Sequence, residues 1–169
     1  MAGTTRKIVA CGMLIIGIVL TGLAYREHQP FAEARVKQEA LVQMAVAELE
    51  KGSEDPMDRQ IDFESLQRLN PDIIGWINVP GTAIDYPIVQ GNSGDPGYYL
   101  HHNASKRWDY HGAPYLTWEC AEGGLLHSPN ALVFGHHLQD GTMFSKLSGF
   151  IDVAYLDEHT PIQIQTPTE

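Results

Sequence analysis

The pattern of apolar and polar residues divides the chain into an uncharged N-terminal run, a helical stretch and a region of short strands. The uncharged run covers residues 8–25, and as a helix these 18 residues would extend about 27 Å. That length is close to the hydrocarbon core of a bilayer, which is roughly 30 Å thick. We therefore expect a transmembrane anchor over residues 8–25, preceded by a cytoplasmic tail at residues 1–7.

The residues around this run indicate its orientation. Arg6 and Lys7 precede it, and the basic end of a membrane span tends to stay in the cytoplasm. We expect a single-pass protein of the cell membrane with its C-terminal domain outside the cell. Gly22 and Ala24 also fit a cleavage site, so a removed signal peptide is an alternative. Cys11 stands at the start of the run, which favours a packing or lipid-facing thiol over a lipoprotein site.

Residues 26–60 are expected to form a helical stalk and a linker. Residues 31–51 contain no Gly or Pro, and their composition is typical of a helix. Apolar side chains recur on one stripe at helical spacing, at Val42, Ala45, Val46 and Leu49. A membrane-proximal stalk, a coiled coil and a helix packed against its own domain all agree with this stripe.

Residues 61–169 have the pattern of a separate domain with short strands. A short helix is expected near 63–69, with Asp62 as its N-terminal cap and the Asn70–Pro71 pair as its end. Extended segments are expected at 75–79, 83–90, 113–118, 131–134 and 161–166, and a further short helix at 142–150. Short strands separated by turns predict a mainly β fold, either a barrel or a sandwich.

The last of these segments shows strict alternation. Ile162 and Ile164 alternate with Gln163 and Gln165, which predicts a strand with one wet face.

Composition and charge exclude several classes of function. The 169 residues include 11 Lys and Arg against 21 Asp and Glu, a formal net charge of −10. This balance argues against nucleic-acid binding, which needs a basic face for the phosphates. The two cysteines cannot form a disulfide framework or a CxxC zinc site. The sequence also has no GxGxxG, Walker A, HExxH or GxSxG motif, so no cofactor is expected.

Histidine is the main candidate residue type for metal binding or acid–base catalysis in this sequence. The chain has eight histidines, four of them in two adjacent pairs: His28, His101, His102, His111, His127, His136, His137 and His159. Neighbouring residues on a strand point to opposite faces, so neither pair makes a good metal site. We therefore expect no metal, and solvated or partly buried histidines instead.

His136 is the best placed of the eight. It follows Gly135 at the end of the predicted strand 131–134, which is expected to be buried. A histidine at the mouth of a strand beside a glycine is a common setting for a general acid or base. A histidine without a catalytic role is the alternative.

Three motifs in a fixed order make the chain resemble class B sortases, the membrane-anchored cysteine transpeptidases of Gram-positive bacteria. The resemblance covers roughly residues 61–166. Its motifs are Asn70–Ile77 running into Gly81–Gln90, then Tyr98–Leu100, and finally Phe134–His137 with Gly141–Phe144. The predicted anchor and helical stretch also suit that family.

The resemblance implies a closed β-barrel with flanking helices and an activity at the cell wall. A cysteine thiolate of the family attacks the threonine carbonyl of a C-terminal sorting signal on a surface protein, and an amine of the cell-wall peptide resolves the thioester. A histidine acts as acid and base, and an arginine stabilises the oxyanion. By the motif, His136 takes the catalytic histidine's position, and Leu100 and Phe134 line the sorting-signal groove. The family usually has Tyr at Phe134 and often Asn at Pro96.

The chain departs from the family at the nucleophile and the arginine. In sortases both follow the histidine, whereas this sequence has no Cys or Arg after His136. Cys120 precedes the histidine, and the adjacent Glu119 disfavours a thiolate. Arg68 and Arg107 also precede His136. We therefore expect an incomplete barrel without its late strands, and no transpeptidase activity by the chain alone.

Three hypotheses for the function follow. The first is a C-terminally truncated, sortase B-like protein that is inactive by itself. The second is a non-enzymatic, membrane-tethered module that binds sorting signals or a full-length sortase. The third is a histidine-rich metal binder outside the cytoplasm.

Overall fold

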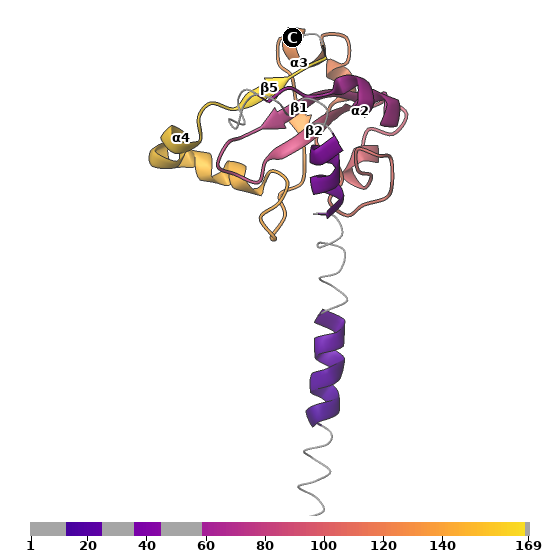
Figure 1. The fold of residues 1–169 in the computed structure, drawn as a ribbon, viewed down its shortest axis with the longest axis vertical. Coiled ribbons are helices and arrows are strands. Elements are labelled where there is room, and N and C mark those ends of the chain that lie inside the picture. Colours follow the sequence, from indigo (N-terminus) through magenta and orange to yellow (C-terminus); the bar gives the residue numbers. More distant parts are fainter. Residues whose placement is uncertain (1–12, 25–35, 45–58, 168–169) are drawn as a thin grey trace, which may run out of the picture. The chain divides into compact units, whose positions relative to one another are not determined.

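The computed structural model describes residues 13–24, 36–44 and 59–167, which form parts of two compact units, Met1–Arg35 and Val36–Glu169 (Figure 1). The described part of the first unit is a helix at 13–24. Within these described ranges, no helix combines the length and apolar character needed to cross a membrane. The predicted tail at 1–7, and residues 8–12 and 25 of the predicted anchor, lie outside the described residues.

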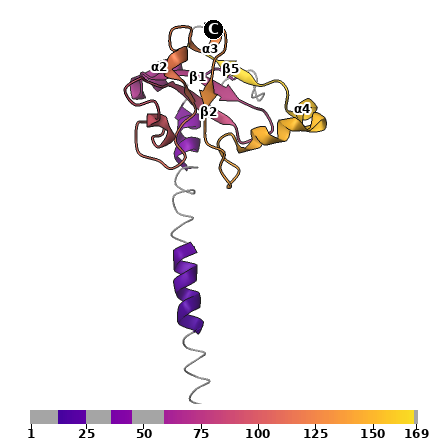
Figure 2. The same cartoon turned by 180° about the vertical axis from the view of Figure 1, so that it is seen from behind.

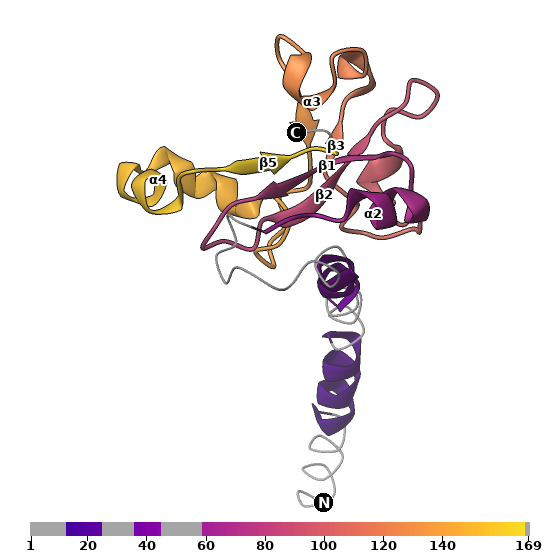
Figure 3. The same cartoon turned by 45° about the horizontal axis from the view of Figure 1, so that its top comes forward.

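The second unit is built on a five-stranded sheet with the order β4-β3-β2-β1-β5 (Figure 3). At its centre β1 (Ile73–Asn78) and β2 (Asp85–Gln90) form an antiparallel hairpin. On one side of the hairpin, β3 (Tyr115–Leu116) runs parallel to β2, and β4 (Val133–Phe134) runs antiparallel to β3. On the other side, β5 (Gln163–Gln165) runs antiparallel to β1.

The central hairpin is buried on both faces, and its side chains divide between two apolar clusters. Trp76 and Val89 belong to a cluster that includes α2, whereas Ile77 and Ile88 belong to a second cluster. Successive strand residues point to opposite faces, so each cluster covers one face of the hairpin. This two-sided burial explains why β1 and β2 are apolar on both faces of the sheet. The hairpin lies in the middle of the domain in both views (Figures 1 and 2).

Two helical segments pack on the first cluster. The predicted helix at 63–69 is confirmed as α2 (Phe63–Leu69), and Asp62 caps it by accepting a hydrogen bond from the Ser65 amide at 3.0 Å. The helix at 36–44 places Leu41 and Val42 against the same cluster. For these residues the contacts favour a helix packed against its own domain. Residues 26–35 and 45–58, most of the predicted stalk and linker, lie outside the described residues.

The described sheet is open, which agrees with the incomplete barrel that we expect for this sequence and differs from the closed barrel of the family. Its order ends at β4 on one side and at β5 on the other. The expected mainly β fold is confirmed only in part: the sheet forms the centre of the domain, but helices and 3₁₀ turns lie between or beside its short strands (Figure 1). The turns and helices that were not predicted are η2 (Tyr98–Leu100), η3 (Trp118–Cys120), α3 (Gly124–His127) and α4 (Val153–His159).

Two segments near His136 differ from their predictions. The strand expected to be buried at 131–134 is the short edge strand β4, with Val133 half-buried and Phe134 49% exposed. The helix expected at 142–150 is the 3₁₀ segment η4 (Ser145–Ile151), which begins later because Met143 has φ +52°. A left-handed backbone at Met143 is incompatible with a helix that starts at residue 142.

The alternating strand at the other edge is present as β5, with an unexpected orientation. Ile164 of β5 and Ile162 just before the strand are 43% and 45% exposed, while Gln163 and Gln165 are half-buried. The Gln165 side chain donates to the Arg59 carbonyl at 2.8 Å, which turns it toward the domain. The exposed face of β5 is therefore apolar.

Candidate functional site

Two close contacts with Phe144, one from the His136 backbone and one from Gly135, fix His136 at the end of β4. The Phe144 amide donates to the His136 carbonyl at 2.9 Å, and this hydrogen bond closes a loop at 137–143. A Cβ atom on Gly135 would lie 2.8 Å from the Phe144 ring. Only glycine fits there without a shift, which gives the glycine before the histidine a structural reason.

The His136 ring is oriented by a backbone carbonyl. Its Nε2 atom lies 2.8 Å from the Leu100 carbonyl oxygen. A carbonyl can only accept, so Nε2 carries the hydrogen and, in the neutral ring, Nδ1 is the nitrogen that can take up a proton. The Tyr110 ring stacks nearly parallel at a centroid distance of 6.3 Å, and the His101 ring is tilted at 6.1 Å. The ring is half-buried and can exchange a proton at one defined atom.

We predict that neutral His136 is the Nε2–H tautomer. Nitrogen chemical shifts of the imidazole, measured by NMR on protein labelled with ¹⁵N at histidine, should show a protonated Nε2 and an unprotonated Nδ1. Exposed His127, which has no such carbonyl contact among the described hydrogen bonds, serves as the comparison within the same spectrum. A protonated Nδ1 at His136 would show that the Leu100 carbonyl does not orient the ring.

The Leu100 carbonyl is itself held by the packing of its neighbours. Tyr99 is buried, and its hydroxyl donates to Asp72 at 2.6 Å and accepts from Asn70 at 3.0 Å. Burial and the negative Asp72 raise the pKa of Tyr99 strongly, so its hydroxyl keeps its proton. Gly112, at φ +62°, comes so close that a Cβ would lie 2.7 Å from the Leu100 oxygen. The acceptor for His136 is therefore part of a tightly packed turn.

The other predicted site residues are distributed around this centre. Leu100 contacts His136 through its backbone, whereas the Phe134 ring stacks on Tyr115 at 5.9 Å and is half exposed. The second histidine of the pair, His137, is exposed. The pair thus points in different directions, as expected for neighbouring residues on an extended chain.

Cys120 has a different set of neighbours from His136. Its Sγ atom donates to the Asn130 carbonyl at 3.3 Å and lies 3.4 Å from the Thr117 hydroxyl, so it links the two ends of a loop. These two contacts give Cys120 a structural role in this loop. Of the two arginines within residues 61–166, Arg68 pairs with Glu64 on the exposed side of α2.

The metal-binder hypothesis requires convergent ligands. Over 13–24, 36–44 and 59–167, no group of three or more His, Cys, Asp or Glu side chains has the arrangement of a metal site.

Sequence reasoning missed the aromatic neighbours of His136. Tyr110 and His101 lie far from it in the chain, and no motif or spacing connects them to it. The contacts depend on the turns at Tyr98–Leu100 and Gly112, which bring separate loops together. Gly112 was the available signal, because a glycine two residues before a proline, here Pro114, indicates a turn.

Comparisons with known proteins identify relatives. No model of a known protein family matches the chain. Sortase B of Listeria monocytogenes is 35% identical over 98 residues, which cover 58% of this chain and 38% of that protein. Sortase B of Staphylococcus aureus is 29% identical over 154 residues, which cover 89% of this chain and 59% of that protein. The chain is related to class B sortases.

Solved sortase B structures share its fold. The Staphylococcus aureus sortase B–substrate complex has a TM-score of 0.65 at 27% identity and covers 80% of this chain and 59% of that one. A sortase B complexed with Gly3 has a TM-score of 0.65 at 26% identity, covering 80% of this chain and 60% of that one. The predicted resemblance to sortase B is confirmed. The chain spans about two fifths to three fifths of the length of these curated relatives.

Proposed function

We propose that this chain contributes the histidine-bearing part of a sortase B-type transpeptidase. The substrates would be a surface protein with a C-terminal sorting signal and an amine of the cell-wall peptide. The observation that carries the proposal is the half-buried His136 ring at the end of β4, fixed through Nε2 by the Leu100 carbonyl. In this geometry Nδ1 would exchange the proton with the thiol and the leaving group, as general acid–base catalysis requires.

The covalent chemistry needs two further groups. A thiolate must attack the threonine carbonyl, and a cationic donor must stabilise the oxyanion. Residues 137–169 contain neither Cys nor Arg, so in this proposal both groups come from polypeptide outside the given sequence, and the 169-residue chain is inactive alone. The exposed Ile164 of β5, and Ile162 just before it, provide apolar surface that added polypeptide would cover, and β5 is an edge of the described sheet to which a further strand could pair.

Reconstitution tests this proposal. The 169-residue chain is mixed with, or fused to, the C-terminal part of Listeria monocytogenes Sortase B that carries the family's cysteine and arginine. Alone, the chain should neither cleave a sorting-signal peptide nor form a thioester detectable by mass spectrometry. With the added part, both should appear, and a Cys→Ala version of that part is the matched control. Binding of the peptide without any restored cleavage would favour the binding-module hypothesis.

An acyl adduct on Cys120 in the chain alone would contradict the proposed division of the site. It would mean that the chain carries its own nucleophile, and the Cys120→Ala variant would then remove the adduct. The outcome therefore distinguishes an incomplete site from a rearranged one.

We also propose that residues 8–25 anchor the protein in the membrane with residues 1–7 in the cytoplasm. The support is the uncharged run preceded by Arg6 and Lys7. Protease added to intact protoplasts should digest an epitope placed after residue 167 and leave an N-terminal epitope protected. Protection of the C-terminal epitope would show that the orientation is wrong.

A further inference from the structure

A buried histidine joins the loop after His136 to a second loop. His111 lies between two carboxylates, with Nδ1 at 3.2 Å from Asp109 Oδ1 and Nε2 at 3.3 Å from Asp140 Oδ2. The side chains of His111 and Asp109 are 7% and 8% exposed, and that of Asp140 is 22% exposed. Asp140 belongs to the 137–143 loop, whereas the other two residues precede Gly112 in a separate turn.

Asp140 also organises its own loop. Its Oδ1 atom accepts from the Thr142 amide at 3.0 Å and from the Thr142 hydroxyl at 2.6 Å. His137 and Met143 form an isolated antiparallel bridge, and the Phe144 amide closes the loop on the His136 carbonyl. A contact that fixes Asp140 therefore restrains the whole 137–143 loop. This loop is closed by the hydrogen bond from the Phe144 amide to the His136 carbonyl.

We propose that His111 acts as an imidazolium that positions His136 by tying Asp140 to Asp109. A neutral imidazole has one N–H, so it can donate to one carboxylate only, whereas the imidazolium donates to both. Such charge-assisted hydrogen bonds are stronger than neutral ones. That the held histidine is catalytic rests on the proposed function, but the link between the loops stands on the observed geometry.

The charges around His111 support this protonation state. Burial by itself lowers the pKa of His111, but the hydrogen bonds and charges of Asp109 and Asp140 raise it above its usual value. Lys37 lies 3.9 Å from Asp109 on the side away from the histidine, and the Tyr110 ring lies at 6.1 Å from the His111 ring. The Asp109 and Asp140 carboxylates outweigh Lys37 because both contact the ring directly.

Further polar groups lie around the carboxylates of Asp109 and Asp140. Asn103 donates to Asp109 at 3.4 Å, and burial, with a smaller effect of the Asp140 charge, raises the pKa of Tyr86. Burial raises the pKa of Asp109 and Asp140, yet hydrogen bonds from their partners lower both below the usual value. At neutral pH the carboxylates are therefore ionised.

The directions of these three pKa shifts decide how the contacts of His111 change with pH. The raised pKa of His111 means that its contribution is complete below about pH 6.5, the unfolded value, and is lost as the pH rises through the raised folded value. The lowered pKa values of Asp109 and Asp140 mean that their contribution is lost only as the pH falls into the acid range. The contacts from Asp109 through His111 to Asp140 are therefore complete between the acid range and the raised pKa of His111. Above that pKa they are lost because His111 gives up its proton.

Amide exchange of the full chain, measured by NMR in detergent micelles, tests the proposal. After correction for intrinsic exchange, protection of the Phe144 amide should fall by about tenfold as the pH passes the pKa of His111. In His111→Gln the protection should be about tenfold lower at neutral pH and independent of pH through this range. The pKa of His111, read from its ring resonances, should coincide with the transition.

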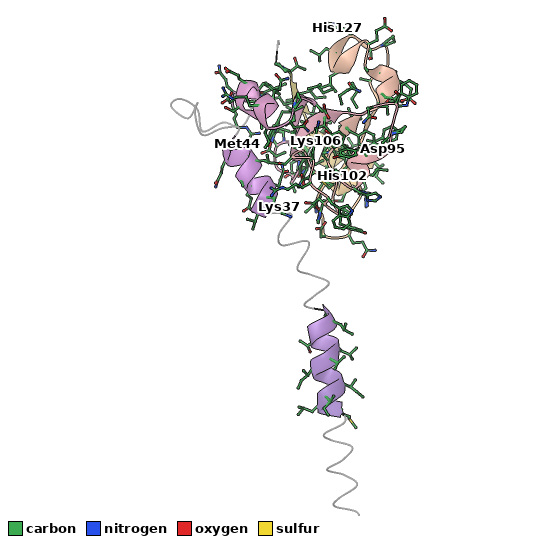
Figure 4. All side chains as sticks on the ribbon, turned by 90° about the vertical axis from the view of Figure 1, so that its right-hand side faces the viewer. Lys37, Met44, Asp95, His102, Lys106 and His127 are labelled. Carbon is green, nitrogen blue, oxygen red and sulfur yellow. The ribbon has the colours of Figure 1, made fainter. Side chains whose placement is uncertain are left out.

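His127→Gln is the matched control, since His127 is an exposed histidine at the end of the domain opposite Lys37 (Figure 4). It should leave the Phe144 protection and its pH dependence unchanged. If His111→Gln does not fold, Asp140→Asn decides, because it removes one carboxylate and should lower the pKa of His111. Wild-type protection in a folded His111→Gln or Asp140→Asn protein would overturn the proposal. Intact pH dependence with failed reconstitution would contradict only the proposed catalytic function.

Discussion

In the reconstituted sortase, His136→Ala is expected to reduce sorting-signal cleavage by about 10³-fold or more. General acid–base catalysis by a positioned side chain contributes about 10²–10⁴-fold, and a histidine that also activates the nucleophile contributes more. The Nε2 contact with the Leu100 carbonyl leaves Nδ1 as the proton-exchanging atom, and alanine removes that atom. Steady-state cleavage of a fluorogenic sorting-signal peptide, with thioester formation followed by mass spectrometry, measures the loss.

The neighbouring histidine provides a matched control for this variant. His137 is exposed, and replacing it with alanine removes the same atoms from the next position in the chain. We expect His137→Ala to keep activity within about threefold of the parent, because surface substitutions seldom disturb a neighbouring site. Comparable losses in both variants would show that the motif, and not the His136 ring, is responsible. Loss in His137→Ala alone would show that the wrong member of the pair was assigned.

The elements that the sequence predicts well are those fixed by local signals. The helix α2 has a capping aspartate at its start and an Asn–Pro pair at its end, and both act within a few residues. The β1–β2 hairpin follows from two apolar segments around a Pro–Gly turn, where Gly81 has φ +77°. These elements do not depend on distant parts of the chain.

The elements whose structure differs from the prediction depend on long-range packing. β4 resembles a buried strand in sequence, but it lies at the edge of the described sheet, where Phe134 stacks on Tyr115 and is still 49% exposed. The alternation in β5 correctly predicts a strand, yet its polarity follows from the hydrogen bond of Gln165 to Arg59. Alternation gives the period of a strand, while the partner decides which face is buried.

The candidate site shows the same division. The position of His136 after Gly135 could be found from the sequence, because the motif is contiguous. Its contact with Leu100 and the link from His111 to Asp140 could not, since each joins loops that are distant in the chain. Histidine protonation depends on such neighbours, so the chemistry of these side chains becomes predictable only from the fold.

Stability of the domain should depend strongly on Trp76. This side chain is 1% exposed in the first apolar cluster, and its indole nitrogen donates to Asp85 at 2.6 Å. Arg59 lies over the ring at 5.7 Å and pairs with the same carboxylate, donating to its second oxygen at 2.9 Å. We expect Trp76→Ala to lower the free energy of unfolding by about 3–5 kcal/mol, a large share of the total for a small domain.

Two further variants separate the causes of this loss. Trp76→Phe keeps an aromatic ring and removes the indole donor, so it should cost about 1–2 kcal/mol, between the parent and Trp76→Ala. Trp108→Ala removes a tryptophan that is 69% exposed and should change the free energy of unfolding by less than about 0.5 kcal/mol. Urea unfolding followed by circular dichroism gives all three values on one scale. Equal losses for Trp76→Ala and Trp108→Ala would contradict the burial of Trp76, whereas equal losses for Trp76→Ala and Trp76→Phe would assign the whole effect to the hydrogen bond with Asp85.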